Sequence, residues 1–193
     1  MGATYATWNP SDKAAPITLS GGNLIATAGV NTTAGIRATQ SKSAGKWYWE
    51  QESTFGRISI GVANSTASLS SYLGSDANGL GYDSNSGNIY KGGSVVATGG
   101  ASYTTNDIIG IAYDADGGTV KFYKNNSLQY TISAGNVPTS PLFPMATTTF
   151  SDQTVMVLKP GPFLTYSPPS GYNQGLYTEV PDLLGGSFLL NFM

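Results

Sequence analysis

The strongest constraint on the fold is the short rhythm of the chain, in which segments rich in β-branched and aromatic residues are brief and end in Gly, Asn, Asp, Ser or Pro. These segments predict strands over residues 17–28, 35–39, 46–53, 57–63, 88–90, 94–98, 107–113, 119–124, 128–133, 142–148 and 154–158. No long window shows a convincing helical period, so any helix that is present is expected to be a single turn near residues 65–73. The pattern predicts an all-β protein.

The clearest local pattern lies between residues 107 and 133. Ile109 and Ile111 alternate with smaller or polar residues before a Gly-rich turn at residues 114–118. Val120 and Phe122 then share one face of the next strand, and a Lys-Asn-Asn-Ser turn leads into a third strand. The segment is therefore predicted to be a three-stranded antiparallel meander in which these four apolar side chains are buried.

The chain length of 193 residues is the size of one domain. Many short strands, tight turns and no βαβ spacing favour a two-sheet antiparallel β-sandwich. A closed barrel is the alternative arrangement of the same strands.

Seven sequence segments follow one another between residues 8 and 172. They are WNPSDK (8–13) with LSGGNL (19–24), GKWYWE (45–50), ISIGVA (58–63), GLGYDSNSGNIYKGG (79–93), DIIGIAYDADGGTVKFYKNN (107–126), PLFPM (141–145) and PFLTYSPPSGY (162–172). In this order they resemble a SPRY domain, particularly the versions found in bacteriophage and prophage proteins. One departure is VLKPG at residues 157–161, where similar sequences usually carry an Asn-Phe-Gly-Gln type run.

The resemblance implies a concanavalin-like jelly roll over residues 1–172, with function carried by loops at one rim. Residues 173–193 extend beyond the usual end of such a domain and are interpreted as a docking or assembly tail. Within it, Phe188, Leu189, Leu190, Phe192 and Met193 are the candidate assembly residues, because no charge follows Asp182 and these side chains need an apolar surface.

Composition excludes several function classes. Cys and His are both absent, which excludes thiol nucleophiles, disulfides, zinc sites of the Cys/His kind and triads that need imidazole. Only 10% of residues are charged and the nine Lys and Arg are scattered, so neither nucleic acid nor an anionic membrane is expected as a partner. No apolar run reaches the length of a membrane span, and no targeting segment is visible. No cofactor is expected.

Two acidic motifs are candidates for catalysis or metal binding. Glu50 and Glu52 share one strand face, as paired carboxylates of a glycosidase could, but the third acid of such patterns is replaced by Thr54. A solvated strand face is therefore favoured over catalysis. Residues 83–88 resemble the start of a calcium loop, but the closing Glu is replaced by Ser94, so no metal site is predicted.

The candidate ligand-binding residues lie in and beside the Gly/Ser/Asn-rich region 65–105. Tyr beside small polar residues is the composition of adaptable recognition loops, although ordinary surface loops give the same pattern. The predicted set is Tyr72, Asp76, Asn78, Tyr82, Asp83, Asn85, Tyr90 and Tyr103.

The sequence thus predicts a non-enzymatic structural or adhesion component of a bacteriophage virion, located in the tail fibre, tail tip or capsid decoration. Its expected partners are other virion proteins, further copies of the chain, and a host-surface glycan or protein. The resemblance of the motifs to phage versions of the domain favours this interpretation, as does a surface rich in Ser, Thr, Gly and Asn but poor in charge. The alternatives are a free-standing peptide- or carbohydrate-binding module and a glycan hydrolase that uses Glu50 and Glu52.

Overall fold

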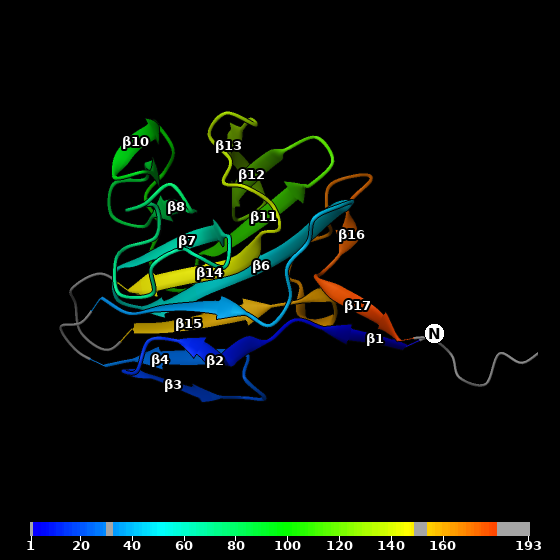
Figure 1. The fold of residues 1–193 in the computed structure, drawn as a ribbon, viewed down its shortest axis with the longest axis horizontal. Coiled ribbons are helices and arrows are strands. Elements are labelled where there is room, and N and C mark those ends of the chain that lie inside the picture. The colour runs from blue at the N-terminus through cyan, green and yellow to red at the C-terminus, as the bar shows by residue number, and fades with distance from the viewer. Residues whose placement is uncertain (1, 30–32, 149–153, 181–193) are drawn as a thin grey trace, which may run out of the picture.

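A computed structural model describes residues 2–29, 33–148 and 154–180. Two antiparallel sheets pack face to face, as Figure 1 shows. The first, here called the β7 sheet, has the order β10 (Ser94–Ala97), β9 (Ile89–Lys91), β8 (Gly79–Asp83), β7 (Ile58–Ala63), β14 (Phe143–Thr148), β5 (Gly35–Ala38) and β2 (Trp8–Lys13). The predicted all-β sandwich is confirmed.

The second sheet, here called the β6 sheet, covers the other side of the core. Its order is β13 (Ser127–Ile132), β12 (Thr119–Lys124), β11 (Ile108–Asp114), β6 (Lys46–Phe55), β15 (Thr154–Lys159), β4 (Ile25–Ala28) and β3 (Ile17–Ser20). A further short strand, β16 (Asn173–Gln174), pairs parallel with β6. A two-stranded ribbon of β1 (Gly2–Tyr5) and β17 (Tyr177–Val180) lies beside the two sheets.

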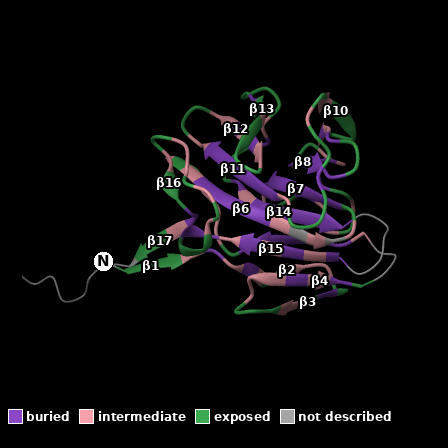
Figure 2. Cartoon of the chain, turned by 180° about the vertical axis from the view of Figure 1, so that it is seen from behind, coloured by how far each residue is buried: buried purple, intermediate pink, exposed green. Residues whose placement is uncertain are grey.

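The core lies between the sheets because each strand alternates apolar inward positions with outward ones. Trp49 of β6 is paired with Ile111 of β11, and both are fully buried. Trp8 of the β7 sheet donates its indole N–H to the Met156 carbonyl of the β6 sheet, 3.2 Å away. Figure 2 shows the buried residues concentrated in the strands of the two sheets and the exposed ones in the ribbon and the turns.

The meander predicted between residues 107 and 133 is confirmed. Strands β11, β12 and β13 pair antiparallel, and Ile109, Ile111, Val120 and Phe122 are fully buried. A register shift after Phe122 places Leu128 on the outer face, where its side chain is half exposed.

Several predicted boundaries were wrong. Residues 17–28 form two strands, because Gly21, Gly22 and Asn23 adopt positive φ and turn the chain back on itself. Residues 65–73 contain turns and bends and no helix. The helix found in the described part of the chain is the three-residue 3-10 turn Gly161–Phe163. No helix among the described residues is long and apolar enough to cross a membrane.

The first part of the predicted tail belongs to the packed fold. Leu176 is buried in the core, β16 pairs with β6, and β17 pairs with β1. Residues 173–180 are therefore docked on the sandwich, and the assembly role of the tail stays a prediction. The candidate assembly residues Phe188, Leu189, Leu190, Phe192 and Met193 lie outside the described residues.

Candidate functional site

A cavity of about 600 Å³ opens where four turns and loops meet at one end of the sandwich. We call it the rim pocket. Its lining comes from residues 56–57 between β6 and β7, residues 84–85 after β8, residues 102–105 before β11, and Lys124 at the end of β12. These segments lie far apart in the sequence, and the pairing of the strands brings them together.

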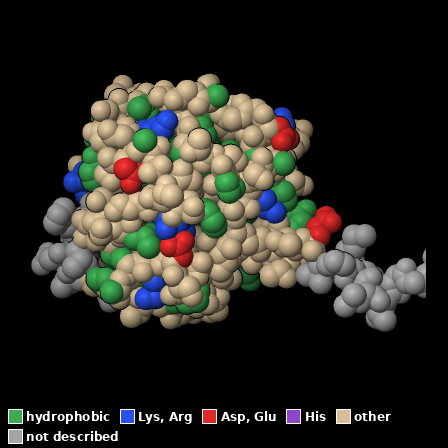
Figure 3. Space-filling view, viewed as in Figure 1, with side chains coloured by type: hydrophobic (Ala, Val, Ile, Leu, Met, Phe, Trp, Pro, Cys, Tyr) green, Lys and Arg blue, Asp and Glu red, His purple; other side chains and the backbone are tan. Residues whose placement is uncertain are grey.

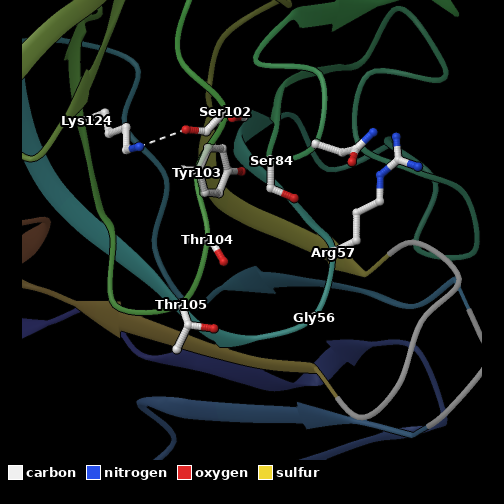
Figure 4. Close-up of a pocket in the computed structure, with 9 residues that line it drawn as sticks. Gly56, Arg57, Ser84, Ser102, Tyr103, Thr104, Thr105 and Lys124 are labelled. Atoms are coloured by element: carbon white, nitrogen blue, oxygen red, sulfur yellow. Dashed lines mark hydrogen bonds between the residues drawn. The ribbon is translucent and has the colours of Figure 1, made fainter.

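The wall of the rim pocket is built mainly from small polar side chains. Asn85, Ser102, Thr104 and Thr105 are exposed, and within the described part of the chain none of their side chains makes a hydrogen bond. Figure 4 shows Thr104 and Thr105 at one side of the opening and Ser84 across from Lys124. The pocket therefore offers hydroxyl and amide groups that a ligand can engage.

Two ion pairs border the rim pocket from opposite walls. Arg57 contacts Asp83 at 3.3 Å, and Lys124 contacts Asp107 at 3.2 Å. Lys124 also donates to the Ser102 carbonyl at 2.7 Å, which is the dashed contact in Figure 4. These contacts connect the ends of β8 and β12 to the loops and hold the walls in place.

Tyr103 forms the inner wall of the pocket but does not present its ring to solvent. Its hydroxyl donates to the Tyr82 carbonyl at 2.6 Å, and its ring is 4% exposed. Burial raises the pKa of Tyr103 well above its usual value, so the hydroxyl stays protonated. Tyr82 is also fully buried, with its ring against those of Tyr103, Phe122 and Tyr130. The structure therefore places both of these predicted ligand-binding residues in the core, and of the two Tyr103 lines the pocket.

Tyr72 and Tyr90 are placed differently. Their rings pack edge to face with centroids 5.9 Å apart, Tyr72 is 37% exposed, and Tyr90 is partly buried. Neither residue lines the rim pocket. Their role in binding stays a prediction.

The remaining candidate residues mostly serve the loops themselves. Asp76 accepts hydrogen bonds from the Ser68 and Asn78 N–H groups at 3.0 and 2.8 Å, which fixes the loop before β8. The Asn78 side chain accepts from Asn64 at 3.2 Å. Asp83 is buried behind Arg57, so among the predicted polar residues Asn85 is the one whose exposed side chain lines the pocket.

The expectation of a solvated face at Glu50 was wrong. Its side chain is fully buried, and its two oxygens accept hydrogen bonds from the Thr165 N–H at 2.6 Å, the Tyr166 N–H at 2.9 Å and the Tyr48 hydroxyl at 3.1 Å. The segment after β15 therefore covers the outer face of β6. In this conformation Glu50 does not face a substrate, and it acts as the attachment point of the covering segment.

Glu52 pairs with Lys159 of the neighbouring strand at 2.8 Å and is largely shielded. Within the described residues, no group of three or more acidic side chains could hold a metal ion.

The ribbon lies at the other end of β6 from the rim pocket. Trp47, the second residue of β6, packs edge to face against Tyr177 of the ribbon with ring centroids 5.2 Å apart. Lys42 lies 3.7 Å above the Trp47 ring and donates to the Tyr177 carbonyl, and burial lowers its pKa. Gly56 follows the last residue of β6, so about ten strand residues, or roughly 30 Å, separate the two regions.

Charge is sparse on the surface as well as in the composition. Figure 3 shows a face that is mostly neutral, with acidic and basic side chains scattered singly or in small opposite-charge groups. The side chains of Arg57, Ser102, Thr104, Thr105 and Lys124 were not predicted as site residues. Arg57 and Lys124 are terminal residues of predicted strands, and the other three lie in a predicted loop. This position is the one sequence signal that could have pointed to them.

The chain is similar to one known protein family and to several solved structures. The model of the SPRY domain family matches residues 46–161. The crystal structure of the SPRY domain of human HERC1 is similar with a TM-score of 0.69 at 19% identity, covering 79% of this chain and 96% of that chain. The crystal structure of the TRIM65 PSpry domain gives 0.64 at 19% identity, covering 80% and 92%.

A third similar structure is that of stonustoxin, with a TM-score of 0.65 at 19% identity. The likeness covers 80% of this chain but 27% of stonustoxin, which is a longer chain. At this identity, the three structures establish a shared fold. Curated proteins give no match to the chain.

Proposed function

The chain belongs to the SPRY domain family, and we propose that it is a non-enzymatic binding domain that holds a partner in the rim pocket. SPRY domains are typically protein-interaction modules and are generally not enzymes. The observation that carries the proposal is the pocket itself, a cavity of about 600 Å³ lined by exposed polar side chains. Four segments that are held by strand pairing and ion pairs form its walls, so a ligand meets a preformed site.

The position of the ribbon supports different roles for the two ends of β6, with attachment at the ribbon and recognition at the rim pocket. The ribbon holds the N-terminal and C-terminal strands together, and the Lys42, Trp47 and Tyr177 cluster packs it against the sandwich. We place attachment to neighbouring proteins at this end. Recognition at the rim pocket is then free of steric conflict with the attachment.

We further propose that the setting is a bacteriophage particle, in which this chain is a structural or adhesion component. The support is the charge-poor composition rich in Ser, Thr, Gly and Asn, together with the resemblance of the motifs to phage versions of the domain. The proposed partners are other virion proteins, further copies of the chain, and a host-surface protein or glycan. The chain would then be found in the extracellular particle.

Two observations weigh against the hydrolase alternative. Glu50 is fully buried with both oxygens engaged, and Glu52 is paired with Lys159. A free-standing binding module shares the rim pocket with the main proposal and differs only in not being part of a particle.

Filling the rim pocket tests the binding proposal. Thr105→Trp places a large ring in the pocket, whereas Thr131→Trp makes the same change on the exposed outer face of β13. Both variants and the wild type are immobilised and exposed to host envelope proteins and to a glycan array. A ligand retained by the wild type and by Thr131→Trp but lost by Thr105→Trp supports the proposal, and equal retention by all three refutes it.

The particle setting has a separate test. Mass spectrometry of gradient-purified particles and electron microscopy with an antibody to this chain should locate it in the virion. Its absence from intact particles would remove the phage role and leave the binding module.

A further inference from the structure

The lining of the rim pocket is asymmetric in charge. It includes two cationic side chains, Arg57 and Lys124, and no carboxylate. A ligand that enters the pocket therefore meets positive groups and hydroxyl groups at contact distance. The two aspartates that pair with the cations lie outside the lining.

Both aspartates are engaged by donors other than the cations. Asp83 accepts hydrogen bonds from the Ser86 N–H and hydroxyl, each at 2.8 Å, and its side chain is 8% exposed against 46% for Arg57. Asp107 accepts from the Thr104 N–H at 2.8 Å and from the Asn125 amide at 2.6 Å. Burial raises the pKa of Asp107, but these hydrogen bonds and Lys124 outweigh it and lower the pKa overall. Both carboxylates are thus stabilised by hydrogen bonds from groups other than Arg57 and Lys124.

Lys124 retains capacity for a ligand. Its ammonium group donates to the Ser102 carbonyl at 2.7 Å and contacts Asp107 at 3.2 Å. An ammonium group has three hydrogens, so one donor is left. The hydroxyls of Thr104 and Thr105 also line the pocket and make no hydrogen bond to the rest of the described chain.

We propose that the rim pocket binds an acidic side chain of a partner protein, with the Asp or Glu carboxylate held by Lys124 and the hydroxyls of Thr104 and Thr105. The inference rests on the proposed function, because it names the chemistry of the partner at the same pocket. Hydrogen bonds between charged groups are short and strong, so a carboxylate gains more from this wall than an amide does.

A protein segment fits this pocket better than a sugar. Sugars use exposed aromatic faces, and the aromatic residue in the lining, Tyr103, is only 4% exposed. The net charge of the chain is −2, so attraction of an acidic segment depends on the local contacts in the pocket and not on the overall field.

The test is a titration of the isotopically labelled full chain with capped tetraglutamate, followed by the shifts of backbone amide resonances. The matched probe is capped tetraglutamine, which has the same length and shape without charge. Tetraglutamate should shift the amides of residues 102–105 and Lys124 and bind at least about tenfold more tightly than tetraglutamine.

Three variants assign the effect. Lys124→Met should abolish the preference for tetraglutamate, Lys124→Arg should keep it, and Lys121→Met, the same change on the same strand outside the pocket, should leave it unchanged. Lys124 also supports the loop through Ser102, so a change at Lys124 can disturb the loop as well as remove the charge. A second measurement therefore uses the wild-type chain and varies the salt concentration. The salt concentration is raised from 0.05 to 0.5 M, values chosen to shorten the Debye length to roughly 4 Å. This change should weaken the binding of tetraglutamate and leave the binding of tetraglutamine unchanged.

Equal affinity for the two peptides, shifts confined to other surfaces, or no shift at millimolar tetraglutamate would each overturn the acidic-ligand inference. None of these results bears on the Thr105→Trp experiment, which tests whether the pocket binds at all. Loss of all ligands on filling the pocket, combined with no charge preference, would keep the proposed function and reject this inference.

Discussion

Glu50 provides the sharpest stability prediction, because one buried carboxylate holds the segment that covers β6. It accepts hydrogen bonds from the Thr165 N–H, the Tyr166 N–H and the Tyr48 hydroxyl. Burial, followed by the charge of Glu50, raises the pKa of Tyr48, so its hydroxyl stays a donor at all ordinary pH values. Glu50→Gln keeps the size of the side chain but replaces one acceptor oxygen by a donor NH₂ group.

The cost follows from the donors left without an acceptor. A hydrogen bond to a charged group contributes about 1.5–3 kcal/mol, and a buried donor without a partner costs about 1–3 kcal/mol. Because the glutamine amide opposes at least one backbone N–H in either orientation, Glu50→Gln should lower the free energy of unfolding by about 2–4 kcal/mol. For a chain of this size, that corresponds to a fall in Tm of roughly 5–15 °C.

Urea denaturation and calorimetry measure the effect, and Glu52→Gln is the matched control. Glu52 forms one ion pair with Lys159, and Lys159 also donates to the Thr165 hydroxyl at 3.0 Å, so the loss of the Glu52 charge should cost less than the change at Glu50. Hydrogen exchange at the Thr165 and Tyr166 amides should accelerate in Glu50→Gln more than exchange in the meander. Equal stability of Glu50→Gln and Glu52→Gln, or unchanged exchange at these amides, would refute the reasoning.

Three further predictions concern the core, the pocket wall and pH. Phe122→Ala should lower the free energy of unfolding by about 3–5 kcal/mol, because the ring is fully buried, and a loss under about 1 kcal/mol in urea denaturation would place it outside the core. Tyr103→Phe removes the hydroxyl that donates to the Tyr82 carbonyl and should cost about 1–2 kcal/mol in thermal unfolding, and an unchanged Tm would contradict this. The Gly117 N–H, followed by Lys46, holds the pKa of Asp114 below its usual value despite partial desolvation, so the folded state binds fewer protons than the unfolded state. The resulting stability is present above the ordinary Asp pKa and is lost as the pH falls through the pKa of Asp114 in the folded state. Asp114→Asn should therefore reduce the difference in unfolding midpoint between pH 7 and pH 3. An unaltered difference would contradict the role given to Asp114.

The fold was predictable where side chains alternate along a strand. The meander is the best example, because its apolar positions and its two turns are all local in sequence. Strand β8 was missed since Gly79 and Gly81 interrupt the alternation. These glycines are required by close packing, because a Cβ at Gly81 would overlap the Leu73 carbonyl oxygen.

The site was harder to predict because it depends on contacts between distant segments. Tyr82 and Tyr103 lie in a loop-rich region by composition, but their rings pack in the core against Phe122 and Tyr130. Glu50 becomes buried only because residues more than 100 positions downstream cover it. Turn residues mark where loops occur in a sequence, but they do not show which loops meet.

The most direct test of the central claim is hydrogen–deuterium exchange of the full chain with and without the host envelope ligand retained by the wild-type protein. If the rim pocket is the binding site, protection should appear in residues 56–57, 84–85 and 102–105 and at Lys124, while the β1–β17 ribbon exchanges as in the free chain. Protection confined to the ribbon or to β3 and β4, with the rim pocket unchanged, would contradict the account.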